Sequence, residues 1–225
     1  MTALIQTIGL SKTYTAGKNI QTPALANINL TIDAGDFMAV AGPSGSGKSS
    51  LLHLLGALDN ANSGSIIYEG RDITQLNNEQ RAQFRLKHIG FVFQAYNLIN
   101  TLNALENVEY IMLLQGIGND ERKDRAVDML IRVGLGDYIY RFPNEMSGGQ
   151  QQRVAVARAI AAKPKIILAD EPTANLDSKT ASSLMDLMRQ LNEENKITFI
   201  FSTHDQLVMS KVKKIVTLKD GEIVK

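Results

Sequence analysis

The sequence predicts an α/β protein with a mainly parallel sheet, and two features carry this prediction. First, apolar strand-like runs such as Phe37–Ala41 and Lys165–Ala169 alternate with helix-periodic segments such as Ser178–Asn195, the order typical of parallel sheets. Second, the stretch from about residue 96 to residue 163 has helical character throughout. We therefore expect one domain over residues 1–225, with an α-helical subdomain inserted at about 96–163 and an antiparallel β subdomain formed by the first strands. The length of 225 residues by itself also suits two small domains.

Strands are expected where short apolar runs are bounded by turn residues. These runs are Leu4–Leu10, Leu25–Ile32, Phe37–Ala41, Ser65–Tyr68, Ile89–Phe93, Lys165–Ala169, Thr198–Ser202 and Ile215–Leu218. Helices are expected where apolar residues recur every three or four positions. The first has the stripe Leu51, Leu52, Leu54, Leu55 and Leu58, and the later ones are Ala104–Gln115, Asp120–Val133, Gly148–Ala162 and Ser178–Asn195. Turn residues gather at Thr15–Pro23 and at Asp220-Gly221, and the second pair predicts a hairpin.

Composition narrows the function classes. The net charge is +1, whereas a general nucleic-acid binder has a strong basic excess, so we expect no nucleic-acid partner. The chain has no cysteine, which excludes disulfides and thiolate metal sites. Residues 1–10 lack the basic and apolar regions of a signal peptide. No apolar run reaches the roughly 18–20 residues that span a bilayer, so a membrane role is expected only through a partner.

A glycine-rich loop between a predicted strand and a predicted helix matches the pattern G-x-x-x-x-G-K-[ST] throughout. Its glycines let backbone amides surround phosphate oxygens at the positive end of the helix. Lys48 is then expected to reach the β- and γ-phosphates and the Ser49 hydroxyl to bind Mg²⁺, with Ser50 as a further phosphate contact. The alternative is a glycine-rich turn that fits by chance. The matching residues are Gly42, Pro43, Ser44, Gly45, Ser46, Gly47, Lys48 and Ser49.

Two adjacent carboxylates, Asp170 and Glu171, follow the strand predicted at Lys165–Ala169. Asp170 is placed at the strand end to hold the hydration shell of a metal ion, and so is expected to act through water. Glu171, one residue later, points elsewhere and can orient or deprotonate an attacking water molecule. Such a pair is by itself equally typical of a solvated turn. Together with a phosphate-binding loop in the same chain, it predicts hydrolysis of a nucleoside triphosphate.

A second candidate anion site lies at the start of the helix predicted from residue 148. Ser147 can cap that helix, and Gly148, Gly149 and Gln150 form its exposed, positively polarised first turn. The simpler interpretation is an ordinary Ser-Gly-Gly helix start. One chain has no evident need for two sites facing the terminal phosphate of one nucleotide.

This second motif gives the sequence a clear family resemblance. Met146–Gln150 resembles the Leu-Ser-Gly-Gly-Gln signature of ABC-transporter nucleotide-binding domains, and the resemblance extends over essentially the whole chain. It implies a P-loop NTPase core and an Mg²⁺-dependent ATPase in which two copies pair head to tail. The signature of one copy then closes over the ATP held by the other. Two departures are noted: Met146 replaces a leucine, and Asn175 stands where a small residue is commoner.

The resemblance also implies roles for four residues outside these motifs. Tyr14 corresponds to the aromatic residue that stacks on adenine. Gln94 corresponds to the glutamine that touches Mg²⁺ and the attacking water, and that relays motion to the membrane partner. Asp177 corresponds to an aspartate that contacts the opposite subunit, although it is also a plausible helix cap. His204 corresponds to the histidine that bonds the γ-phosphate and orients Glu171.

Within the family, the sequence resembles the stand-alone ATPases of the lipoprotein-release and macrolide-export group, the LolD and MacB types. Segments Leu52–Asp59, Ile89–Gln94 and Leu105–Val108 carry this closer likeness. It implies a homodimer that drives an integral membrane permease subunit from the cytoplasmic face of the inner membrane. The alternative is an FtsE-like regulator, in which the same motion controls a membrane complex and no cargo crosses.

Overall fold

The computed structural model describes residues 3–16 and 20–224. Residues 17–19, the middle of the predicted Thr15–Pro23 turn, lie outside the described residues, as do Met1 and Thr2 of the segment considered as a signal peptide.

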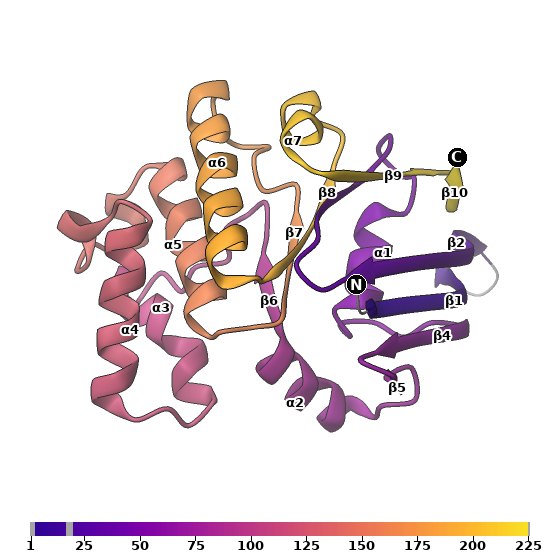
Figure 1. The fold of residues 1–225 in the computed structure, drawn as a ribbon, viewed down its shortest axis with the longest axis horizontal. Coiled ribbons are helices and arrows are strands. Elements are labelled where there is room, and N and C mark those ends of the chain that lie inside the picture. Colours follow the sequence, from indigo (N-terminus) through magenta and orange to yellow (C-terminus); the bar gives the residue numbers. More distant parts are fainter. Residues whose placement is uncertain (1–2, 17–19, 225) are drawn as a thin grey trace.

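The larger sheet has six strands in the order β10-β9-β3-β8-β7-β6 and confirms the predicted mainly parallel sheet (Figure 1). All neighbours pair in parallel except β10, which is antiparallel to β9. The predicted hairpin turn at Asp220-Gly221 joins these two strands. The strands are β3 (Phe37–Ala41), β6 (Ile89–Val92), β7 (Ile166–Asp170), β8 (Thr198–Thr203), β9 (Lys214–Lys219) and β10 (Glu222–Val224).

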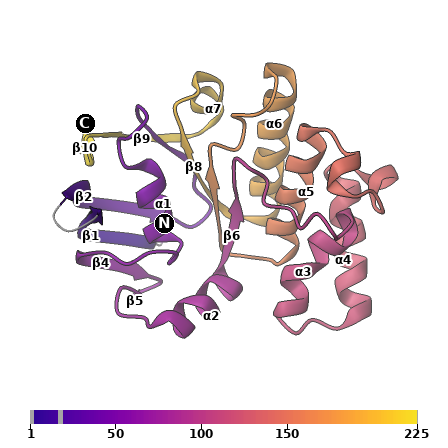
Figure 2. The same ribbon diagram turned by 180° about the vertical axis from the view of Figure 1, so that it is seen from behind.

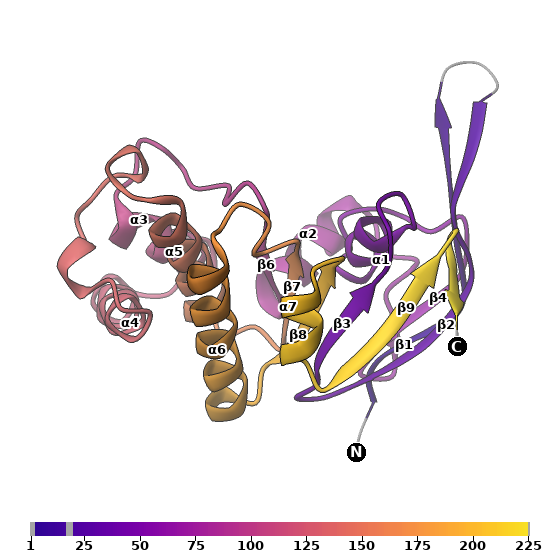
Figure 3. The same cartoon turned by 90° about the horizontal axis from the view of Figure 1, so that it is seen from above.

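The smaller sheet, in the order β2-β1-β4-β5, is antiparallel, as predicted for the first strands. Its strands are β1 (Ala3–Ala16), β2 (Ile20–Asp33), β4 (Ser63–Tyr68) and β5 (Arg71–Asp72). β1 and β2 continue well beyond their predicted apolar runs, and their far ends extend away from the rest of the molecule (Figure 3). The added residues 11–15 and 21–24 pair through their backbones and include no fully buried apolar side chain, so the apolar pattern did not reveal them.

Seven α-helices are present among the described residues: α1 (Lys48–Leu55), α2 (Asn78–His88), α3 (Ala104–Leu114), α4 (Asn119–Arg132), α5 (Gly148–Ala161), α6 (Ser178–Asn195) and α7 (Gln206–Lys211). The five predicted helices are confirmed, but α2 and α7 were not predicted. Two expectations are wrong in detail. α1 ends at Leu55, which leaves Leu58 41% exposed rather than buried in its stripe. Residues 96–103, expected to begin the helical stretch, form turns and loop before α3.

The six-stranded sheet separates two hydrophobic cores. Residues that alternate along a strand face opposite sides, so Phe37 and Ala39 of β3 join one core while Met38 and Val40 join the other. The first core contains the buried faces of α3, α4, α5 and α6, and the second contains α1 and the antiparallel sheet. Figures 1 and 2 show the corresponding separation from both sides. α1 and α5 therefore lie on opposite faces of the same sheet.

No helix within the described part of the chain combines the length and apolarity needed to cross a membrane.

Candidate active site

Strand register brings four predicted site segments to one edge of the six-stranded sheet. β3, β8, β7 and β6 are neighbours that run in parallel, so their carboxyl ends lie side by side, the usual place for a ligand in an open α/β sheet. The loops that begin at Gly42, Glu171 and His204 start at this edge, and Gln94 follows the end of β6. The aligned pairs are Ala41 with Thr203, Asp170 with Ser202, and Val92 with Ala169.

The glycine-rich loop wraps around the start of α1. Gly47 precedes the helix in a left-handed conformation, with φ of 100°, and no described side chain caps the first turn. Lys48 is only 7% exposed, and its Nζ donates hydrogen bonds to the carbonyl oxygens of Gly42 at 2.8 Å and Pro43 at 3.0 Å. The ammonium group is thus held inside the loop, beside helix amides that have no side-chain acceptor.

Two of the loop glycines also permit close packing against other strands. A Cβ on Gly42 would lie 2.1 Å from the carbonyl oxygen of Leu218 in β9. A Cβ on Gly47 would lie 2.3 Å from the carbonyl oxygen of Ala24 in β2. The amide of Gly221 donates to the Ser46 carbonyl at 3.1 Å. The back of the loop is therefore fixed by β2 and by the β9–β10 hairpin, contacts that the motif does not reveal.

Gly47→Ala is expected to destabilise the protein strongly. Its Cβ would overlap the Ala24 carbonyl, and its φ of 100° is unfavourable for a residue with a side chain, which together cost about 2–4 kcal/mol. Gly45→Ala is the matched control because its φ is +81° but no atom of the described residues lies within 4 Å of the added Cβ, so only about 1 kcal/mol is expected. Thermal unfolding without nucleotide compares the two. Equal melting temperatures would contradict the packing argument.

The two carboxylates that end β7 have different partners. Asp170 Oδ1 accepts a hydrogen bond from the Ser49 hydroxyl at 3.1 Å and another from the Ser202 hydroxyl. Glu171 Oε1 instead lies 2.8 Å from His204 Nδ1 and 4.0 Å from Lys48 Nζ. The Glu171 side chain is 16% exposed, whereas that of His204 is 60% exposed. One carboxylate thus faces the predicted metal-binding hydroxyl, and the other lies between the predicted phosphate-binding lysine and histidine.

The loop after β6 is held by two side chains that sequence reasoning did not assign to it. Asn175 Nδ2 donates to the backbone carbonyl of Gln94 at 3.0 Å. Arg158 of α5 donates to the carbonyls of Tyr96 at 2.9 Å and Asn97 at 2.6 Å, and burial lowers the pKa of Arg158. The unusual Asn175 therefore fixes the backbone of the predicted glutamine, while the Gln94 side chain remains exposed.

The signature segment begins α5 on the other face of the sheet. Ser147 Oγ accepts from the Gln150 amide at 3.3 Å, and Gln150 Oε1 accepts from the Ser147 amide at 2.8 Å, so the predicted cap is present. A Cβ on Gly148 would lie 2.7 Å from the Tyr96 hydroxyl, and one on Gly149 would lie 2.6 Å from a Thr180 methyl carbon. The helix that this segment begins packs across the sheet from α1, the helix that follows the phosphate loop.

Asp177 caps α6, the simpler of the two roles predicted for it. Its Oδ1 accepts from the amides of Lys179 at 3.1 Å and Thr180 at 3.0 Å, and its Oδ2 accepts from the Thr180 hydroxyl at 2.6 Å. The hydrogen bonds from Thr180 lower the pKa of Asp177 below its usual value. A cap does not prevent the same residue from contacting a second subunit.

Tyr14 lies on β1, opposite Thr22 of β2. Thr22 is two residues from Ala24, the residue whose carbonyl touches the Gly47 position, so the β1–β2 ribbon lies next to the phosphate loop. The Tyr14 side chain is 39% exposed. One face of its ring is covered by the Lys12 ammonium, 4.8 Å from the ring centroid.

The predicted metal ligands fit magnesium. Among the described residues, no cluster of three or more acidic, histidine or cysteine side chains is suited to hold a metal ion. The Ser49 hydroxyl and the Asp170 carboxylate lie 3.1 Å apart, and Gln94, with an exposed side-chain amide, follows the end of the neighbouring strand β6. These are hard oxygen donors, and Mg²⁺ is commonly held by one or two protein groups together with water and substrate phosphates. The donor set therefore suits Mg²⁺ that arrives with a nucleotide.

Comparison with known families agrees with this geometry. The family model described as "ABC transporter" matches residues 25–174, which include the phosphate loop, the signature segment and the β7 carboxylates. The chain belongs to the ABC transporter family. It is an ATP-binding subunit of that family, and its likeness to the LolD and MacB group is confirmed by the relatives it matches.

Two sequence relatives and one solved structure show how similar this ABC subunit is to known proteins. The macrolide export ATP-binding/permease protein MacB of Nitrosomonas europaea is 45% identical over 98% of this chain and 33% of its own length. The lipoprotein-releasing system ATP-binding protein LolD of Colwellia psychrerythraea is 42% identical over 99% of this chain and 86% of its own. The dimeric post-hydrolysis structure of the cassette MJ0796, bound to ADP and Pi, has a TM-score of 0.90 at 42% identity and covers 98% and 97% of the two chains.

Proposed function

We propose that this ABC subunit hydrolyses ATP with Mg²⁺ in a head-to-tail dimer with a second copy, and that the dimer drives an integral membrane partner. One observation carries the dimer: α1 and α5, which bear the phosphate loop and the signature, pack on opposite faces of one sheet. Two anion sites placed in this way do not meet on one nucleotide. A second copy supplies the missing half, and the similar MJ0796 cassette is a dimer bound to ADP and Pi.

Hydrolysis in this proposal depends on positioning and charge rather than on covalent chemistry. The Lys48 ammonium exchanges the carbonyls of Gly42 and Pro43 for the β- and γ-phosphates. Glu171 holds the attacking water in line, and His204, 2.8 Å from it, keeps its carboxylate oriented. Ser147 and Gly149 of the second copy complete the site around the γ-phosphate.

Ser49, Gln94 and, through water, Asp170 are the residues that would hold Mg²⁺. When bound with ATP, the ion neutralises charge on the phosphates. The hydroxyls of Ser49 and Ser202 already orient the Asp170 carboxylate toward this position.

Asp170→Asn is expected to raise the Mg²⁺ concentration needed for half-maximal ATPase activity by about tenfold or more, because the neutral amide holds the hydration shell less well. A magnesium titration of phosphate release measures the change. Asp186→Asn is the control, since Asp186 pairs with Lys211 at the exposed side of α6 and α7. An unchanged magnesium dependence in Asp170→Asn would remove that residue from the metal site.

The dimer is tested by the dependence of phosphate release on protein concentration. If each active site uses two chains, specific activity rises with concentration and then saturates as the dimer becomes the main species. A specific activity that is constant down to nanomolar protein, together with a monomeric size at that concentration, would contradict the sandwich.

An apolar groove next to Gln94 supports the membrane partner. The groove has a volume of about 680 Å³ and is lined by α2, α3, α5 and the loop after β6. Phe93 and Asn97, on either side of Gln94, both line it, as do the exposed Tyr110 and Leu114 of α3. A partner seated there would contact the loop that carries the predicted magnesium-binding glutamine. The likeness to the LolD and MacB relatives supports placing the subunit on the cytoplasmic face of the inner membrane.

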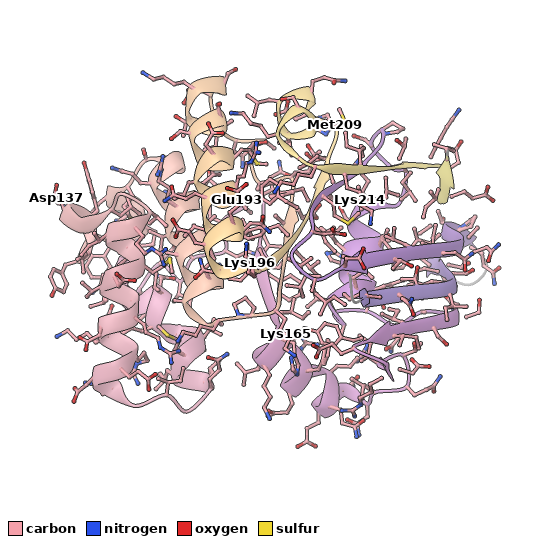
Figure 4. The ribbon with its side chains drawn as sticks, viewed as in Figure 1. Asp137, Lys165, Glu193, Lys196, Met209 and Lys214 are labelled. Carbon is pink, nitrogen blue, oxygen red and sulfur yellow. The ribbon has the colours of Figure 1, made fainter. Side chains whose placement is uncertain are left out.

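Site-specific cross-linking tests the membrane partner. The chain has no native cysteine, so Leu114→Cys introduces a single reactive group into the groove. Glu193→Cys on α6 is the control, at the position labelled in Figure 4. We expect the first variant, and not the second, to cross-link to an integral membrane protein in native membranes. Capture of only soluble proteins, or equal capture by both variants, would contradict the docking proposal.

The identity of that membrane protein separates the two remaining functions. The names of the LolD and MacB relatives favour lipoprotein release or export of macrolide-type compounds. The alternative is an FtsE-like regulator of a membrane complex. A partner with a large periplasmic domain that binds lipoprotein or drug supports transport, whereas a partner of the cell-division site supports regulation.

A further inference from the structure

A buried lysine lies beneath the ring of Tyr14. The Lys12 side chain is only 11% exposed, and lysine is rarely buried so deeply unless it is paired. Its Nζ donates to Asp59 Oδ1 at 2.8 Å and to the Asn60 carbonyl at 2.7 Å. The same nitrogen lies 4.8 Å from the Tyr14 ring centroid. The ammonium group is therefore fixed by two acceptors while it covers one aromatic face.

The loop after α1 fixes the adjoining part of β1 as well. The Thr13 amide donates to Asn62 Oδ1 at 2.8 Å, and the Asn62 amide donates to the Ser11 carbonyl at 2.9 Å. The pKa of Asp59 lies below its usual value, so the carboxylate stays ionised. Burial alone would raise this pKa, but the hydrogen bonds from Lys12 and from the Asn60 amide outweigh that effect. Residues 11–13, directly before Tyr14, are thus hydrogen-bonded to the loop after α1.

We propose that Lys12, held by Asp59 and Asn60, is a positioning residue for the adenine ring of ATP, because it braces one face of Tyr14 and leaves the other face as the stacking surface. This inference rests on the proposed contact between Tyr14 and adenine. A cation against an aromatic face attracts its π electrons. The opposite face then becomes less negative and stacks more favourably on an electron-rich purine.

The inference predicts an effect of Lys12 on binding of the adenine base and not on binding of the phosphates. A comparison of a ligand that has a base with one that has none therefore distinguishes this role from a purely structural one. We expect Lys12→Met, which keeps the length of the side chain but not its charge, to weaken ATP binding about five- to tenfold. Binding of inorganic tripolyphosphate, which has no base, should change less than twofold. Binding is measured by calorimetry with the full chain, and folding by circular dichroism.

Lys214→Met is the matched control. Lys214, labelled in Figure 4, also pairs with one aspartate and one backbone carbonyl, Asp36 at 3.2 Å and Thr31 at 2.9 Å. Within the described part of the chain, it lies over no aromatic ring. It should leave the affinity for ATP unchanged. If Lys12→Met does not fold, Asp59→Asn provides a second variant, because it removes the partner that fixes Lys12 and should weaken ATP binding about two- to threefold.

A double mutant shows whether Lys12 acts through Tyr14. In a Tyr14→Leu background, Lys12→Met should have no further effect on ATP binding. Equal loss of ATP and tripolyphosphate binding in Lys12→Met would overturn the inference, as would a full effect of Lys12→Met in the Tyr14→Leu background. If Tyr14→Leu itself leaves ATP binding unchanged, the proposed adenine contact fails. If Tyr14→Leu weakens binding but Lys12→Met and Asp59→Asn do not, only the present inference fails.

Discussion

Glu171→Gln is expected to stop ATP hydrolysis while ATP binding is retained, so that Mg²⁺ and ATP trap a stable dimer. Glutamine has nearly the same shape as glutamate but cannot orient or deprotonate water in the same way, and loss of such a group lowers the rate by about 10²- to 10⁴-fold. Lys48 still binds phosphate, since its two hydrogen-bond acceptors belong to the loop and not to Glu171. Phosphate release and size-exclusion chromatography with saturating ATP and Mg²⁺ measure both effects.

A surface glutamate provides the control for this change. Glu193 of α6 forms exposed pairs with Arg189 and Lys213, and Glu193→Gln should leave hydrolysis unchanged and form no trapped dimer. A Glu171→Gln protein that remains monomeric with saturating ATP and Mg²⁺ would contradict the sandwich dimer. One that hydrolyses ATP at the normal rate would contradict the role of the carboxylate.

Ser147→Ala is expected to lower hydrolysis by about 10²-fold, the effect of removing one donor from a preorganised site. Because α5 lies across the sheet from the phosphate loop, monomeric nucleotide affinity should change little. In combination with Glu171→Gln, the variant should also form less trapped dimer. ATPase assays and nucleotide binding at protein concentrations below dimerisation separate the two effects.

The helix cap complicates this variant, because Ser147 also stabilises the first turn of α5. Loss of such a cap costs about 1 kcal/mol. Asn103→Ala removes the same kind of capping box from α3 and so matches the stability cost without touching the signature. If Asn103→Ala lowers hydrolysis as much as Ser147→Ala does, the effect is one of stability. If Ser147→Ala weakens nucleotide binding by the monomer as much as hydrolysis, the signature does not act in trans.

Elements with strong local signals were predicted closely. β3 and α6 have the predicted bounds, Phe37–Ala41 and Ser178–Asn195, because the first is a continuous apolar run and the second a long periodic stripe. α2 was missed because none of its described residues is fully buried, and its few packed apolar residues, such as Phe84, form too weak a stripe to detect. The capping pair Asn77 and Gln80 was the available signal.

The predicted catalytic residues could be found from local sequence motifs, whereas the side chains that hold the surrounding segments could not. Glu171 and His204 belong to recognisable motifs, and the structure brings them within hydrogen-bonding distance. Lys12, Arg158 and Asn175 make the supporting contacts, to partners 47, 61 and 81 residues away. Such contacts depend on strand order and on which faces pack together. Local patterns do not contain that information.

The place of β3 in the sheet also affects when the protein becomes functional during its synthesis. β3 carries the phosphate loop, yet both of its neighbours, β8 and β9, come from residues 198–219. A growing chain therefore contains the complete loop sequence long before either flanking strand exists. Pairing over so many residues is slow because a long segment must first be brought back. Nucleotide binding is then a property that the chain acquires only after residues 198–219 have been made, and so later than its helical region.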